Sequence, residues 1–141
     1  MARVVLDANV VVSAAFGGTP LKALVRAFRH EVFVSPLIKE ELVSLPEELA
    51  SKLSPDRMAR LRRYLKILLF KAQMREPKRA VVVCRDPKDD AYLSLCLFAE
   101  VDCLITGDAD LLSISEKSLA SIGLGRLLIV SPKKFLSLRI R

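Results

Sequence analysis

The sequence is poor in residues that bind zinc. It contains a single histidine, His30, and three cysteines among 141 residues. Cys84, Cys96 and Cys103 all lie in apolar segments, and no two of them form a C-x-x-C pair. Isolated thiols of this kind are typical of small buried side chains in a reducing compartment. The composition therefore argues against a zinc site.

The hydrophobicity pattern of the sequence also indicates neither a membrane span nor a signal peptide. No stretch approaches the roughly 18 uninterrupted apolar residues of a membrane span. Asp7 and Asn9 break the one N-terminal run that could resemble a signal peptide. Internal repeats, low-complexity tracts and long linkers are absent as well. We therefore expect a single domain over residues 1–141, with no membrane partner and a cytoplasmic location.

Apolar runs and a basic charge are what the chain does have. Hydrophobic residues make up 52% of it, in runs of about four to six that suit a buried parallel sheet. The net charge is +7 although 16 residues are acidic. If several of these acids gather in one pocket, the remaining surface is more basic than the total indicates. An anionic polymer is then a natural partner, although domains that bind no nucleic acid can carry a similar charge.

Proline positions mark the expected helix starts. Five of the seven prolines follow Ser, Thr or Asp, and a capping residue before proline is a helix-start signal. These pairs are Thr19-Pro20, Ser35-Pro36, Ser54-Pro55, Asp86-Pro87 and Ser131-Pro132. The predicted order is strand 3–6, helix 20–30, strand 32–34, helices 36–45 and 55–73, strand 80–84, helix 87–100, strand 103–105, short helices over 109–121, strand 126–130 and a helix from 132. This alternation predicts a three-layer α/β/α sandwich with a mostly parallel central sheet.

The predicted helix over residues 55–73 is strongly amphipathic. Its apolar stripe consists of Met58, Leu61, Leu65, Leu68 and Ala72. The remaining face carries Arg57, Arg60, Arg62, Arg63, Lys66 and Lys71. That face is either an ordinary solvated surface, a track for phosphates, or a face that meets a partner.

Acidic residues follow most of the predicted strands. They occur as Asp7-Ala8-Asn9, Glu40-Glu41, Asp86, Asp89-Asp90 and Thr106-Gly107-Asp108-Ala109-Asp110. Because the carboxyl ends of parallel strands share one edge of the sheet, carboxylates that are far apart in the sequence are expected to meet there.

Helix phase separates the two glutamates. The apolar residues of helix 36–45 span an arc of about 140°, and Glu41 falls inside this arc whereas Glu40 lies outside it. Glu40 is therefore predicted to be a solvated surface acid. A carboxylate on the buried stripe is costly unless it is paired or binds a metal, so Glu41 is the candidate ligand.

The acids around Pro87 can be sorted by their capping roles. Asp86 fits the N-cap, and Asp89 occupies the third helical position, where an acid favours the free amides and the helix dipole. Asp90 lies just beyond, in an otherwise nearly apolar helix, and lacks an obvious structural role. Asp90 is therefore the predicted functional acid of this group.

The remaining acids point to a divalent cation. Asp7 lies between two apolar runs, and Asp108 and Asp110 are spaced as D-x-D in an expected loop, although Asp108 or Thr106 could instead cap a short helix. Carboxylates without histidine or cysteine partners form a hard oxygen site, which suits Mg²⁺ or Mn²⁺. Such ions activate water and stabilise charge on a reacting phosphate, so phosphodiester hydrolysis is the functional hypothesis.

Four segments together carry a family resemblance. They are residues 4–14 (VVLDANVVVSA), 34–42 (VSPLIKEEL), 86–90 (DPKDD) and 104–112 (LITGDADLL). In order and spacing they resemble the PIN domain family, in particular the stand-alone VapC-like toxins of prokaryotic toxin–antitoxin pairs. Ala8 stands where the family commonly has Thr, at a position that is not a usual ligand.

The resemblance implies a metal-dependent ribonuclease. The family acids map onto Asp7, Glu41, Asp90 and Asp108, with Asp110 as a frequent additional acid around Mg²⁺ or Mn²⁺. Asn9, Ser13 and Thr106 match positions that commonly support the site through hydrogen bonds. The resemblance also implies an RNA substrate, a homodimer and, for a toxin, a small cognate antitoxin.

Three alternatives stay open. The first is a PIN nuclease that processes RNA without an antitoxin, and the second is a PIN module that binds RNA without turnover. The third is a phosphatase of the haloacid dehalogenase type, although Asp7-Ala8-Asn9 departs from the D-x-D of that family.

Overall fold

Five short parallel strands form the central sheet in the computed structural model, which describes residues 1–139. They are β1 (Arg3–Leu6), β2 (Glu31–Val34), β3 (Gln73–Met74), β4 (Cys103–Ile105) and β5 (Leu128–Val130). Their order across the sheet is β3-β2-β1-β4-β5. The chain thus moves outward from β1 to one edge and returns on the other side of β1, which creates the kind of switch point where α/β proteins bind ligands.

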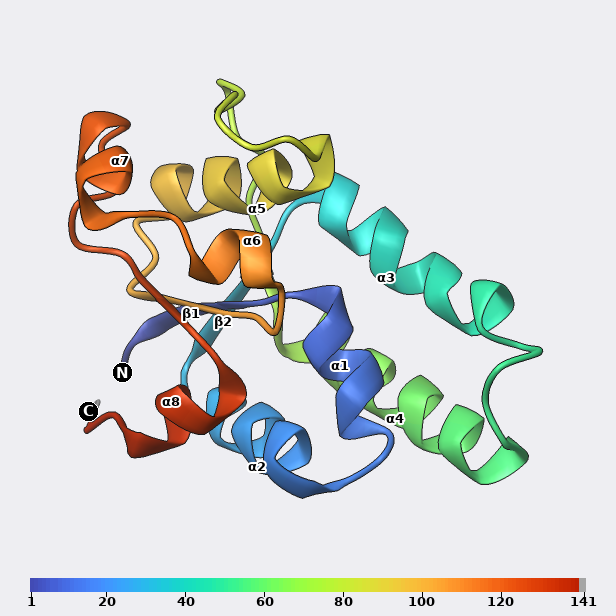
Figure 1. The fold of residues 1–141 in the computed structure, drawn as a ribbon. Coiled ribbons are helices and arrows are strands. Elements are labelled where there is room, and N and C mark those ends of the chain that lie inside the picture. The colour runs from blue at the N-terminus through green and yellow to red at the C-terminus, as the bar shows by residue number, and fades with distance from the viewer. Residues whose placement is uncertain (140–141) are drawn as a thin grey trace.

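Helices connect the strands and cover the sheet. They are α1 (Ala8–Ala14), α2 (Gly18–Ala27), α3 (Pro36–Glu48), α4 (Pro55–Lys71), α5 (Pro87–Phe98), α6 (Ala109–Leu112), α7 (Glu116–Ser121) and α8 (Pro132–Ser137). Figure 1 shows α5 and α7 on one side of the sheet and α2 and α8 on the other. The predicted α/β sandwich with a parallel sheet is confirmed.

The hydrophobic core lies on the central strands. Val4, Val5 and Leu104 are completely buried, and Val4 pairs with both Val32 and Cys103 in the parallel register. In the described part of the chain, no helix is long and apolar enough to cross a membrane.

Four of the five predicted helix starts are confirmed. Ser35, Ser54, Asp86 and Ser131 are N-caps whose side chains accept a backbone N–H of the following turn, each with proline in the first turn. The prediction at Thr19 is wrong, because α2 begins earlier, after Gly17. Gly17 has a φ of 83°, a conformation that favours glycine.

The predicted strand over residues 80–84 is wrong. This segment is irregular, and side chains of α5 accept three of its backbone N–H groups. Ser94 Oγ accepts that of Val81 at 2.8 Å, and Asp90 Oδ1 accepts those of Val83 and Cys84 at 3.0 and 2.8 Å. The sheet position beside β2 is occupied instead by β3, which was not predicted. Helix α4 ends at Lys71, two residues before the predicted end, so that the chain can enter β3.

Helix α1 was also not predicted. It begins directly after β1, with Asp7 as its N-cap, and buries Val10 and Val11. The amphipathic stripe predicted for α4 is correct, since Leu61, Leu65 and Leu68 are its buried residues.

Candidate functional site

Asp7 and Thr106 lie side by side at the carboxyl ends of the two central strands. Leu6 of β1 is in register with Ile105 of β4, so the next residue of each strand emerges at the same edge of the sheet. Thr106 Oγ1 donates a hydrogen bond of 2.6 Å to Asp7 Oδ2, and both side chains are buried. This short charge-assisted contact fixes the orientation of the Asp7 carboxylate.

The loop after β4 is held against the start of α1. Asn9 Oδ1 accepts the backbone N–H of Gly107 at 3.3 Å, and Thr106 Oγ1 accepts that of Asp108 at 3.0 Å. Asp108 then caps α6 by accepting the N–H of Asp110 at 2.9 Å. Two residues predicted to support the site, Asn9 and Thr106, therefore lie beside the acids. The third, Ser13, is exposed one turn further along α1.

Glu41 approaches the same edge from α3. As helix phase predicts, Glu40 is exposed whereas Glu41 is half-buried. The hydroxyl of Tyr92, on α5, accepts the N–H of Ala8 at 3.0 Å and donates to Glu41 Oε1 at 3.4 Å. Tyr92 thereby connects α5 to the first turn of α1 and to the glutamate of α3.

Asp89 brings a further carboxylate from α5. One carboxylate oxygen from each of Asp89, Asp108 and Asp110 lies within 4.8 Å of the other two. Asp89 is buried, Asp108 is partly buried and Asp110 is exposed, so the cluster opens to solvent on one side. We call Asp7, Glu41, Asp89, Asp108 and Asp110 the acidic cluster.

Burial and mutual repulsion alter the acidity of the cluster. Burial, a hydrogen bond with Asp108 and the charge of Asp108 raise the pKa of Asp89 to about 7. Burial also raises the pKa of Asp7, and the charge of Asp108 adds to this effect. The pKa of Glu41 is raised by burial and then by the charge of Asp7. These couplings show that carboxylates from four separate segments act on one another.

Comparison of the sequence with models of protein families identifies the family of the chain. The family model described as PIN domain matches residues 3–110, which is more than half of the chain. The chain is a member of the PIN domain family. PIN domains are generally nucleases and typically use divalent metals, in agreement with an acidic cluster that could hold a metal. Comparison with curated proteins gives no significant match.

The donor set of this PIN domain fits a hard divalent cation. All groups of the cluster are carboxylate oxygens, and Mg²⁺ and Mn²⁺ prefer such oxygen ligands. The raised pKa values of Asp7 and Asp89 show that the negative charges are poorly compensated by the protein alone. A cation would remove this repulsion.

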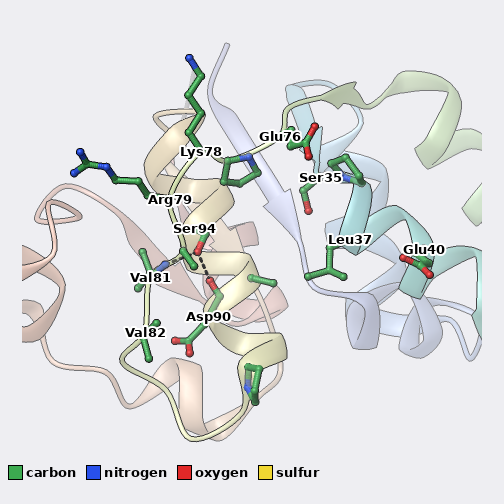
Figure 2. A pocket seen from close by; sticks show the side chains of 15 residues that line it. Ser35, Leu37, Glu40, Glu76, Lys78, Arg79, Val81, Val82, Asp90 and Ser94 are labelled. Carbon is green, nitrogen blue, oxygen red and sulfur yellow. Dashed lines mark hydrogen bonds between the residues drawn. The ribbon is translucent and has the colours of Figure 1, made fainter.

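Asp90 of the PIN domain is hydrogen-bonded to the segment before α5 and is not one of the three acids that lie within 4.8 Å of one another. Asp90 Oδ1 accepts the N–H groups of Val83 and Cys84, and Asp90 O accepts the hydroxyl of Ser94 at 2.8 Å. Burial alone would raise its pKa, but the two backbone donors and the side chain of Cys84 together outweigh burial and lower it. Figure 2 shows Asp90, Ser94 and Val81 together on one wall of a cavity of about 830 Å³, opposite the first turn of α3.

The sequence predicts only a structural role for Asp89 and gives no direct signal of a role for Tyr92. An acid in the first turn of a helix is explained by the helix dipole, and that role of Asp89 remains valid alongside its contact with Asp108. In the sequence, Tyr92 is not distinguished from the large apolar residues of the same helix. A buried tyrosine hydroxyl needs a hydrogen-bond partner, and this is the one signal that could have indicated Tyr92.

Proposed function

We propose that this PIN domain is an endoribonuclease that depends on Mg²⁺ or Mn²⁺ and acts as the toxin of a type II toxin–antitoxin pair. The observation that carries the nuclease proposal is the convergence of carboxylates from β1, α3, α5 and the β4–α6 loop at one edge of the sheet. Burying repelling charges destabilises a protein, so a cluster of this kind needs a compensating function.

The cation would be held by Asp89, Asp108 and Asp110, with Asp7 next to them. Thr106 orients Asp7 through its short hydrogen bond, and the Asp7 carboxylate in turn caps α1. A bound divalent ion would supply Lewis acidity and offset the negative charge of a reacting phosphodiester. No side-chain nucleophile is required.

Glu41 takes a different position in this proposal. It lies at the edge of the cluster, half-buried, and its hydrogen bond from Tyr92 limits its rotation. From there Glu41 is suited to orient a water molecule or to complete the ligand set. Asp90 was the ligand expected from the sequence, and Asp89 takes its place here because the Asp89 carboxylate faces Asp108.

Cleavage of end-labelled RNA in Mg²⁺, Mn²⁺ or EDTA tests the proposal. Cleavage should occur with either ion and stop in EDTA. Glu41→Gln should lower the rate by tenfold or more, whereas the neighbouring Glu40→Gln, at an exposed position of the same helix, should not change it. RNA that stays intact at every metal concentration would refute the nuclease proposal and favour a module that only binds RNA.

The toxin role is supported by the resemblance of the ordered segments to stand-alone PIN toxins. A toxin should arrest growth when it is expressed alone, and co-expression of the product of an adjacent gene should restore growth. Arrest that also occurs with Asp7→Asn would show that nuclease activity is not its cause. Sedimentation analysis of the purified protein tests the proposed homodimer.

A further inference from the structure

A row of exposed side chains leads from the acidic cluster along α1. Asn9 and Ser13 are one turn apart on this helix, and Phe16 follows in the turn after it, so the three residues share one face. Asn9 is joined to the cluster through its hydrogen bond from Gly107. At the rise of a helix, Phe16 lies about 10 Å from Asn9 along this face.

Phe16 presents an aromatic ring to solvent at the far end of this row. It is 53% exposed, and the guanidinium carbon of Arg57 lies 4.4 Å from the centroid of its ring. Arg57 comes from the first turn of α4, and α1 packs against α4. The ring of Phe16 is therefore accessible to a ligand, and the guanidinium of Arg57 lies beside it.

Further basic residues of α4 extend the positive charge that begins at Arg57. The helix contains one acid, Asp56, and six basic residues, all of them exposed: Arg57, Arg60, Arg62, Arg63, Lys66 and Lys71. Arg57 and Arg60 are three residues apart and therefore lie on the same side of the helix. We call the surface formed by Asn9, Ser13, Phe16, Arg57 and Arg60 the α1–α4 path.

We propose that the α1–α4 path binds the single-stranded stretch of RNA that flanks the phosphodiester at the acidic cluster. The proposal rests on the proposed ribonuclease function and specifies the form of the substrate. Phosphates complement Arg57 and Arg60 in charge, and an unstacked base can stack on Phe16 or on the guanidinium plane beside it. A base within a duplex is already stacked on its neighbours and cannot stack on Phe16 as well. The path should therefore bind single-stranded RNA in preference to a duplex.

Binding of a short fluorescein-labelled single-stranded oligoribonucleotide in EDTA, measured by fluorescence anisotropy, tests the proposal without cleavage. The double variant Arg57→Gln/Arg60→Gln should weaken binding at least tenfold. It should also reduce the slope of log K against log salt by about 1.4, because each phosphate contact on a single strand contributes about 0.7. Phe16→Ala should weaken binding about tenfold, and Phe16→Tyr should restore it.

The matched control is Lys133→Gln/Lys134→Gln, which removes the same charge from exposed positions of α8. This control should leave both affinity and slope close to those of the parent protein. Equal losses in the two double variants, or no loss in either, would overturn the α1–α4 path. The proposal would also be overturned if binding of a polyglutamate peptide depended on Arg57 and Arg60 while RNA binding did not. The surface would then be assigned to an acidic protein partner.

The two proposals fail in distinguishable ways. Metal-dependent cleavage that is unaffected by Arg57→Gln/Arg60→Gln would leave the ribonuclease intact and overturn the path. RNA binding that depends on Arg57, Arg60 and Phe16, without cleavage in any metal, would support the path and overturn the ribonuclease.

Discussion

Asp89 and Asp90 are consecutive residues of α5, yet their carboxylates serve different parts of the molecule. Asp89 contacts Asp108 in the acidic cluster, whereas Asp90 accepts two backbone N–H groups of the segment before α5. Consecutive residues of a helix point about 100° apart, so one turn can serve both tasks. We therefore propose Asp89 as the metal ligand, whereas the hydrogen bonds of Asp90 fix the chain that enters the helix.

The first prediction separates these two residues. Asp89→Asn should lower cleavage and Mn²⁺ affinity at least about a hundredfold, because even partners outside the ligand shell contribute 10–100-fold. Asp90→Asn keeps one acceptor oxygen but loses the charge, so it should retain Mn²⁺ binding and lose about 1 kcal/mol of stability. Calorimetric Mn²⁺ titration and urea unfolding measure the two effects. Loss of Mn²⁺ binding in Asp90→Asn alone would restore Asp90 as the ligand.

Local signals explain why so much of the fold could be predicted. Capping residues before proline mark four helix starts, and three of the four strands that were correctly predicted consist almost entirely of buried apolar residues. Helix phase alone placed Glu41 inward and Glu40 outward. These signals depend only on neighbouring residues, which is why they can be read from the sequence.

The errors arise where tertiary contacts decide the conformation. Residues 81–84 are as apolar as a strand, but Val82 is 81% exposed and the backbone donors of this segment bond to Asp90 and Ser94. The edge of the sheet is taken by Gln73–Met74, a segment with no strand pattern. The hydrogen bonds of Asp90 could not be predicted for the same reason, because its partners lie in a loop whose path the sequence does not indicate.

A second prediction concerns Asp7. Asp7→Asn should abolish cleavage, since Asp7 is a central acid of the cluster, while the metal-free protein should be as stable as the parent or more stable. Burial raises the pKa of Asp7, so its charge is unfavourable in the folded state, whereas asparagine also caps helices well. Thermal unfolding in EDTA measures this. Asp7→Ala is the control, because it also removes the charge but loses the cap, at a cost of about 1 kcal/mol.

A third prediction concerns the Tyr92 hydroxyl. Tyr92→Phe leaves the N–H of Ala8 without its partner and frees Glu41, so it should destabilise the protein by about 1–3 kcal/mol and lower cleavage about tenfold. Urea unfolding and RNA cleavage assays measure the two effects. Tyr64→Phe is the matched control, since the hydroxyl of this partly buried tyrosine takes part in none of the hydrogen bonds described for residues 1–139. Equal effects of the two variants would contradict the role of Tyr92.

The final prediction is that the metal-free protein loses stability as the pH rises toward neutrality. The pKa of Asp89 is about 7 in the folded protein against an ordinary value of 3.8. Between these values the folded state binds more protons than the unfolded chain, so the free energy of unfolding falls with increasing pH. The raised pKa values of Asp7 and Glu41 act in the same direction. Melting temperatures recorded in EDTA should therefore decline from about pH 5 to about pH 7.5.

Two comparisons connect this decline to the acidic cluster. Asp89→Asn should flatten it, because asparagine does not titrate, whereas neutralising the exposed Glu40 should leave it unchanged. Mg²⁺ should raise the melting temperature at the upper end of the range and have little effect at the lower end, where protonated Asp89 cannot act as a ligand. If the decline persists in Asp89→Asn, another group must cause it, and repulsion within the cluster would not be what the cation relieves.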